Sequence, residues 1–146
     1  MTRLLLVEAD HTFRLRLVAL LSGRFEVLVP PHGEDPLRLA RATRPEVALI
    51  AAGERARGPA LRLARVLKTD VRAIPALGLY TRPGEESPSA AAFASCGAEG
   101  FAGSVAEPEV LVAFLDALLR GEHPIPSPWP PVGPTRLSRL FRKLRA

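Results

Sequence analysis

The sequence predicts a doubly wound α/β domain, in which a parallel sheet of five strands carries helices on both faces. Short apolar runs at residues 4–7, 47–51 and 76–79 have the composition of strands that are buried on both sides. Stretches with helical periodicity separate these runs, and the alternation of strand and helix repeats along the chain. This alternation is typical of a parallel sheet, because each crossover helix returns the chain to the same edge.

Length and composition fit one domain with an appendage. The chain has 146 residues, and 47% of them are apolar, which is enough for a substantial core. No apolar run approaches the ~20 residues of a membrane span, and the run after Arg3 is too short for the core of a signal peptide. We therefore expect a cytoplasmic protein. Its single cysteine, Cys96, cannot form an internal disulfide and should pack as a small apolar side chain.

The first half of the chain predicts three strands and two helices. A strand over residues 3–7 precedes Asp10, which suits the N-cap of a first helix. An edge strand is expected over residues 25–29, where apolar and wetter positions alternate. Asp35 followed by proline predicts a second helix through about residue 42, and the central strand follows at residues 47–51. The apolar face of the first helix consists of Phe13, Leu17, Leu20 and Leu21.

The second half continues the alternation. After a loop at residues 53–58, a third helix is expected from Pro59, a fourth strand at 74–80 and a polar loop at 81–87. An alanine-rich fourth helix then ends at Gly97, a short strand follows at 99–103, and the last helix runs from Glu107 to Gly121. The apolar positions are Leu61, Ala64, Val66 and Leu67 in the third helix, and Leu111, Phe114, Leu115 and Leu118 in the last.

The C-terminal part differs from the expected domain of residues 1–121. Residues 122–134 are proline-rich, which predicts a semi-rigid extended linker. Residues 135–146 form a basic amphipathic segment that is too short for a stable isolated helix. We expect it to fold on the domain itself, on a second copy or another protein, on an anionic membrane or on nucleic acid. Five of the 20 bases lie in residues 136–146, which contain no acid, so residues 1–135 hold 15 bases against 15 acids. The candidate docking residues of this segment are Arg136, Leu137, Arg139, Leu140, Phe141, Arg142, Lys143, Leu144 and Arg145.

Several short motifs, in their order and spacing, resemble the receiver domain of bacterial response regulators. Residues 5–10 (LLVEAD) look like that family's first strand and acidic cluster, and residues 44–50 (RPEVALI) look like the approach to its phosphorylated aspartate. Residues 74–77 (IPAL) are similar to its fourth strand, and residues 97–101 (GAEGF) to its fifth. The resemblance covers residues 3–120 and implies a flavodoxin-like receiver architecture.

The resemblance implies a phosphorylation site that has lost most of its chemistry. In the family, an aspartate ending the third strand accepts a phosphoryl group, paired acids hold Mg²⁺, a Thr or Ser ends the fourth strand, and a Lys ends the fifth. Carried over position by position, the acid pair falls on Glu8 and Ala9, with Asp10 next to them. The acceptor position falls on Ala51, the hydroxyl position on Tyr80 and the lysine position on Ser104. Only Glu8 keeps the chemistry, because alanine has no nucleophilic oxygen and one glutamate is a poor start for Mg²⁺. Phe101 stands at the family's switch-aromatic position.

The leading hypothesis is a non-phosphorylatable pseudo-receiver that serves as a protein–protein interaction module in bacterial two-component signalling or regulation. The resemblance implies an output surface on the fourth helix, fifth strand and fifth helix, drawn from residues 84–95 and 107–120. The partner would be a signalling protein or a second copy of the chain. The alternative is a regulator that docks on nucleic acid or an anionic membrane through residues 135–146. Trp129 either anchors at a membrane or packs on the body.

An enzyme is the least favoured class. No glycine follows the first strand as a phosphate-binding loop requires, and no Ser/His/acid or Cys/His arrangement stands at a strand end. We therefore expect no catalytic residue, no cofactor and no small-molecule substrate. The three histidines, His11, His32 and His123, lie in unlike surroundings, so we expect no metal site either.

Overall fold

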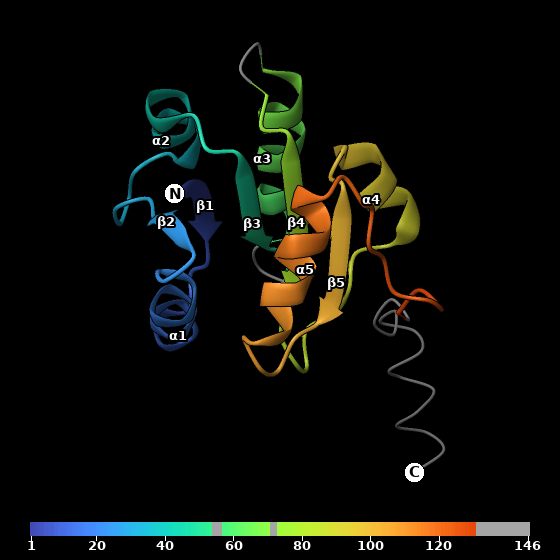
Figure 1. Ribbon diagram of the computed structural model, residues 1–146. Helices are drawn as coiled ribbons and strands as arrows, with labels where there is room; N and C mark the ends of the chain where they lie inside the picture. The colour runs from blue at the N-terminus through green and yellow to red at the C-terminus, as the bar shows by residue number, and fades with distance from the viewer. Residues whose placement is uncertain (54–56, 71–72, 131–146) are drawn as a thin grey trace.

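A computed structural model describes residues 1–53, 57–70 and 73–130 and confirms the doubly wound parallel sheet (Figure 1). The strand order is β2-β1-β3-β4-β5, and all neighbouring pairs are parallel. The strands are β1 (Thr2–Val7), β2 (Phe25–Leu28), β3 (Val47–Ala51), β4 (Ala76–Thr81) and β5 (Gly100–Ser104). The helices are α1 (His11–Leu21), α2 (Pro36–Thr43), α3 (Arg57–Thr69), α4 (Ala90–Cys96) and α5 (Val110–Leu119).

The sheet separates two apolar cores. Helices α1 and α5 cover one face, and α2, α3 and α4 cover the other (Figure 1). Successive side chains of a strand point to opposite faces, so Leu4 and Leu6 enter the first core while Leu5 enters the second. All five residues of β3 are buried, as are all six of β4. Burial on both faces explains why the sequences of these strands are continuous apolar runs.

The strand order places the carboxyl ends of β1, β3 and β4 side by side. Val7 pairs with Ile50, and Ala51 pairs with Tyr80. The chain leaves β1 for the α1 face and leaves β3 for the α3 face, so the order reverses between these two neighbours. Such a reversal opens a crevice at the carboxyl ends, which is where open parallel sheets place their binding sites.

Capping chemistry explains where the helices begin. The Asp10 carboxylate accepts a hydrogen bond from the Phe13 N–H at 2.8 Å, and that of Asp35 accepts one from the Leu37 N–H at 3.0 Å. Both predicted caps are therefore confirmed. Gly97 ends α4 with φ of +80°, a left-handed conformation that glycine adopts without strain. The predicted apolar stripe of α5 is buried throughout.

Several predicted boundaries were wrong by one to three residues. Helix α3 begins at Arg57 rather than Pro59, because proline is tolerated in a first turn, where its missing N–H has no intrahelical partner to lose. Val66 is 40% exposed, and the buried positions of α3 are Ala60, Ala64 and Leu67. Strand β4 includes Thr81, which was expected in a loop but is fully buried.

Residues 122–130 lie against the body of the domain beyond α5. The Phe101 N–H of β5 donates to the Pro124 carbonyl at 2.9 Å, and the Trp129 indole N–H donates to the Pro88 carbonyl at 3.0 Å (Figure 1). The extended path agrees with the proline-rich composition. The expected boundary of the linker at residue 134 and the docking residues of the basic segment, 136–145, lie outside the described residues. Within the described ranges, no helix has the length and apolar character needed to cross a bilayer.

The contact between β4 and α5 leaves no room for a side chain at Gly78. A Cβ atom there would lie 2.7 Å from Leu118 Cδ1 and closer still to the Phe114 ring. We expect Gly78→Ala to lower the free energy of unfolding by about 1–3 kcal/mol, because overpacking displaces α5 from the sheet. Urea unfolding followed by circular dichroism measures the change. Gly23→Ala is the control, since a Cβ at Gly23 meets nothing within 4 Å. Equal stability of the two variants would contradict this packing.

Candidate functional site

A buried hydrogen bond joins two of the positions predicted from the sequence. The Tyr80 hydroxyl at the end of β4 donates to Glu8 Oε1 at 2.7 Å, and both residues are buried. The other carboxylate oxygen of Glu8 accepts a hydrogen bond from the Asp10 N–H at 2.9 Å. The Phe13 ring of α1 packs against the Tyr80 ring, with centroids 5.9 Å apart. Both oxygens of Glu8 therefore have partners inside the protein.

Arg82, directly after β4, supplies the positive charge of the site. One of its terminal nitrogens lies 2.9 Å from Asp10 Oδ2, and its Nε lies 3.7 Å from Glu8 Oε1 and 3.6 Å from Glu85 Oε1. The Arg82 backbone N–H also donates to Glu85 Oε1 at 2.7 Å. Three carboxylates thus surround one guanidinium. Glu8, Asp10, Tyr80, Arg82 and Glu85 are called the Arg82 cluster below.

The surroundings shift the pKa values of three members of the Arg82 cluster, Asp10, Tyr80 and Arg82. The backbone N–H of Phe13, together with Arg82, lowers the pKa of Asp10, which stays ionised. Burial, together with the charge of Glu8 and the hydrogen bond to it, raises the pKa of Tyr80 well above its ordinary value. Its phenol therefore remains a hydrogen-bond donor. Burial opposes the charge of Arg82, but the surrounding carboxylates outweigh this effect and raise the pKa of the guanidinium.

The other predicted positions contribute no charge. Ala51 is 8% exposed, and its methyl group belongs to the apolar core beside Tyr80. Ala9 and Ser104 are exposed, and no hydrogen bond among the described residues links the Ser104 hydroxyl to the Arg82 cluster. Within the described ranges, no set of three His, Cys, Asp or Glu side chains is arranged to hold a metal ion. The carboxylates that approach one another here converge on the guanidinium instead.

Sequence analysis missed Arg82 and Glu85, which it assigned to a polar loop. The available signal was the position of Arg82, the one base in residues 82–86, directly after a buried strand. Glu85 contacts Arg82, after β4, on one side and the backbone after β3 on the other. Its carboxylate lies over Gly53, after β3, where any side chain would collide with it. The requirement for glycine at this position therefore follows from the placement of Glu85.

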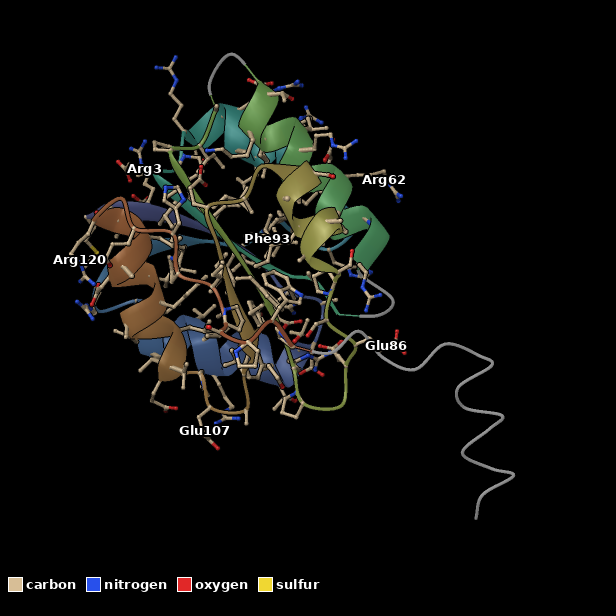
Figure 2. The ribbon with its side chains drawn as sticks, turned by 90° about the vertical axis from the view of Figure 1, so that its right-hand side faces the viewer. Arg3, Arg62, Glu86, Phe93, Glu107 and Arg120 are labelled. Atoms are coloured by element: carbon tan, nitrogen blue, oxygen red, sulfur yellow. The ribbon has the colours of Figure 1, made fainter. Side chains whose placement is uncertain are left out.

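Phe101, at the switch-aromatic position, is enclosed by two other rings. It is 1% exposed, with its ring centroid 5.1 Å from that of Trp129 and 6.3 Å from that of Phe93. The Trp129 and Phe93 centroids are 5.2 Å apart, and Phe93 is directed from α4 toward the body (Figure 2). Trp129 therefore packs on the body, the second of the two roles considered for it from the sequence. The three rings are called the Trp129 cluster below.

Comparison with known proteins shows which solved structures this chain is similar to. No protein-family model matches the chain, and no curated protein matches it significantly. A response regulator protein from Burkholderia multivorans is 28% identical, with a TM-score of 0.60, over 82% of this chain and 96% of the other. A LuxR family DNA-binding response regulator from Silicibacter pomeroyi is 24% identical, with a TM-score of 0.66, over 88% and 100%. The chemotaxis protein CheY4 of Vibrio cholerae is 17% identical, with a TM-score of 0.67, over 81% and 98%.

The fold is that of a response-regulator receiver domain. These neighbours support a role in signalling or regulation. In this chain, the carboxyl ends of the strands carry an internal ion cluster and a methyl group, and the side of β5 carries an internal aromatic cluster.

Tyr80 is the one tyrosine of the chain, so its titration can be followed directly. In the unfolded chain the phenol ionises near pH ~10. Because the fold raises the pKa of Tyr80, its contribution to stability is full below that pH and is lost as the pH rises further. We expect no tyrosinate absorbance while the protein remains folded, and a rise that coincides with alkaline unfolding. Ordinary titration in concentrated guanidinium chloride is the control. Tyrosinate formation near pH ~10 in the folded protein would contradict the buried hydrogen bond.

Removing the guanidinium should leave three carboxylates facing one another. We expect Arg82→Met to lower the free energy of unfolding by roughly 1.5–3 kcal/mol, the range for hydrogen bonds to charged groups. Mn²⁺ should then raise the melting temperature of the variant but not of the wild type, since oxygen ligands suit this ion. Arg24→Met is the control, because the pair of Arg24 with Asp116 lies at the surface. Equal effects of Mn²⁺ on wild type and both variants would show that Arg82 does not act as the counter-ion.

Proposed function

We propose that this chain is a pseudo-receiver that acts without phosphorylation, by binding another protein. The observation that carries this proposal is the Arg82 guanidinium, which lies among Glu8, Asp10 and Glu85 at the ends of the strands. The resemblance to receiver domains implies a divalent cation and a phosphoryl acceptor in this region. Here the positive charge is covalently attached, and the acceptor position is the methyl group of Ala51.

Competition with Arg82 argues against Mg²⁺ binding. For Mg²⁺ to use Glu8 and Asp10, the guanidinium would have to leave both carboxylates, and Glu8 would lose the hydrogen bond from Tyr80. Mg²⁺ also requires several oxygen ligands in near-octahedral order. Since Glu8 is buried with both of its oxygens engaged, this exchange replaces satisfied contacts with an incomplete coordination sphere.

Phosphoryl transfer has no acceptor and no counter-charge at the implied positions. The Ala51 side chain has no lone pair with which to attack a donor. The lysine position is the uncharged and exposed Ser104. Stabilising the negative charge that develops on a transferred phosphoryl group requires cations aimed at it. Arg82 is already neutralised by carboxylates, so it does not supply such a cation.

The outer side of α5 is the part of the expected output surface that we propose for partner binding. The α4–β5 side of that surface is covered by residues 122–130, with Trp129 over Phe101. On α5, Val110 is 54% exposed and Leu119 is 42% exposed. A signalling protein or a second copy of the chain would bury these side chains, gaining the free energy of removing apolar surface from water.

The alternative function is docking on nucleic acid or an anionic membrane through residues 135–146. Its support is the charge distribution, which places the entire formal excess of +5 in the last eleven residues. In addition, one structural neighbour is named as a DNA-binding regulator. A few phosphate contacts would give weak binding that falls steeply with added salt.

Loss of phosphorylation chemistry is tested with a phosphoryl analogue. We expect Mg²⁺ with beryllofluoride to leave the amide resonances of Glu8, Ala51 and Ser104 unchanged in a ¹H–¹⁵N NMR spectrum, because no acceptor oxygen is present to bind the analogue. A phosphorylatable receiver domain treated in parallel is the positive control. Saturable shifts that require both Mg²⁺ and beryllofluoride would overturn the proposal.

Binding through α5 is tested by capture of protein partners and by self-association of the full chain. We expect Val110→Glu with Leu119→Glu to weaken either interaction about tenfold, since charges would be buried in an apolar contact. Val66→Glu is the matched control, because Val66 is exposed on α3, on the other face of the sheet. Fluorescence of Trp129, the one tryptophan, reports whether the variants fold. No partner for the wild type, together with DNA or vesicle binding that is lost on truncation after residue 130, would favour the alternative.

A further inference from the structure

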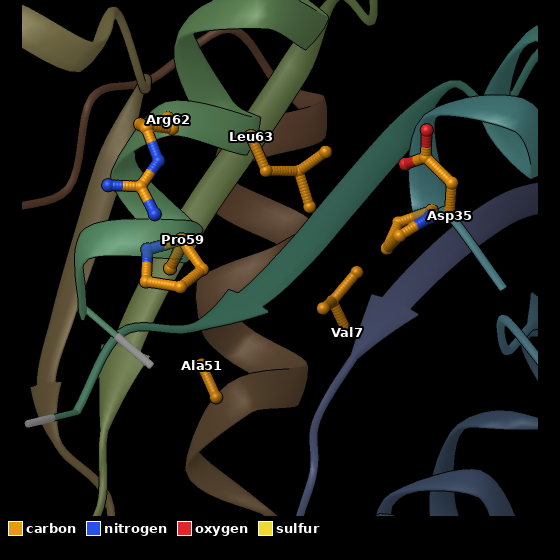
Figure 3. Close-up of a pocket in the computed structure, with 8 residues that line it drawn as sticks. Val7, Asp35, Ala51, Pro59, Arg62 and Leu63 are labelled. Carbon is orange, nitrogen blue, oxygen red and sulfur yellow. The ribbon is translucent and has the colours of Figure 1, made fainter. Parts of the chain in front are cut away.

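A pocket of about 340 Å³ lies at the carboxyl ends of β1 and β3, beside the first turns of α2 and α3. Sequence analysis did not anticipate it. The volume lies within the ~300–1,000 Å³ of typical small-molecule sites. The strand order reverses between these two strands, which is where open parallel sheets bind ligands. The residues that carry the argument are Val7, Ala51, Leu63, Pro59, Asp35 and Arg62 (Figure 3).

The walls of the pocket are largely apolar, with Pro36, Pro59 and Ala60 among the lining residues. Val7 and Leu63 are partly buried and extend this apolar surface between the two helices. Ala51 also lines the pocket, although its methyl group packs in the core on the α1 and α5 side of the sheet. The cavity is therefore suited to the hydrophobic part of a ligand.

The two charged residues at the rim differ in what already engages them. Asp35 and Arg62 lie on opposite sides of the pocket (Figure 3). The Asp35 carboxylate caps α2. The Arg62 guanidinium makes no hydrogen bond or ion pair with any residue in the described ranges, and it projects from α3 at the surface (Figure 2). By contrast, Arg57 and Lys68 of the same helix pair with Glu86 and Glu99.

The surroundings of Arg62 favour a negative charge. Helix α3 contains four basic residues and no acidic residue between Arg57 and Thr69. Its N-terminal end, which carries the positive end of the helix dipole, is the end beside the pocket. A guanidinium binds carboxylates and similar groups through paired N–H donors. An acidic group therefore belongs on the Arg62 side, away from Asp35.

We propose that this pocket binds a small amphipathic anion, with its apolar part against Val7, Ala51 and Leu63 and its acidic group on Arg62. The proposal goes beyond the proposed function and does not depend on a protein partner. Such a ligand would bridge α2 and α3. It would provide a chemical input at the same end of the sheet where the phosphoryl group of other receiver domains is expected.

Two probes with the same ring separate the apolar contact from the charged one. Indole-3-acetate and its neutral amide, indole-3-acetamide, are titrated into the full chain and followed by ¹H–¹⁵N NMR. We expect saturable shifts of Val7, Ala51 and Leu63 with the acid, which should bind at least about fivefold more tightly than the amide. Equal affinities, shifts confined to other regions, or no saturable shift with either probe would overturn the proposal.

Variants on α3 test the role of the charge. Arg62→Gln should weaken binding of the acid about tenfold and leave binding of the amide unchanged. Arg65→Gln is the matched control, because Arg65 is exposed on the same helix but does not line the pocket. Both variants remove one positive charge, so an equal loss in the two would show that only the general field of the protein matters and would overturn the assignment to Arg62.

Variants that fill the pocket test its location. Val7→Phe and Leu63→Phe should each weaken binding of both probes by at least about fivefold, because the added atoms occupy the space of the ring. Both changes are at partly buried positions, so each provides a second test if the other variant does not fold. Trp129 fluorescence and circular dichroism verify folding. Full affinity in either folded variant would place the binding site elsewhere.

Discussion

A carboxylate buried at the end of β1 sets the conditions for everything around it. Glu8 is 6% exposed, and a charge in that position is costly unless hydrogen bonds and a counter-charge compensate it. Tyr80, the Asp10 backbone and Arg82 provide this compensation from two different strand ends. These contacts hold the start of α1 and the ends of β1 and β4 together, because the Glu8 carboxylate takes its hydrogen bonds and its counter-charge from all three places. The folded chain itself therefore supplies a counter-charge for Glu8.

The same end of the sheet is divided into a charged half and an apolar half. The Arg82 cluster lies on the β4 side, whereas the space beside Ala51 and Val7 remains free of charge down to its floor. Two substitutions relative to the expected site act together here. The Ala51 side chain provides no nucleophilic oxygen, and the Tyr80 ring fills the neighbouring position and satisfies Glu8. The receiver fold is preserved because its two cores depend on the strands rather than on these end positions.

Features that depend on residues close together in the chain could be predicted from the sequence, whereas contacts between distant segments could not. The alternation of strands and helices, the Asp10 and Asp35 caps and the stripe of α5 depend on periodicity and on neighbours a few residues apart, and these predictions were confirmed. The contacts of Arg82 with Asp10 and of Trp129 with Pro88 join segments far apart in the chain. No local pattern encodes such contacts. Position matching brought Tyr80 to the site but did not indicate that it would bind Glu8.

The proline-rich segment beside β5 affects how the sheet ends. A strand at the edge of a sheet exposes backbone donors and acceptors to which another chain can add. The Pro124 carbonyl occupies the Phe101 N–H on that side, and the prolines at 124, 126, 128 and 130 have no N–H of their own to offer a further strand. Lateral polymerisation from this side is therefore blocked by residues that can close a sheet but cannot extend it. The domain thus carries its own protection against edge-to-edge aggregation on the β5 side of the sheet.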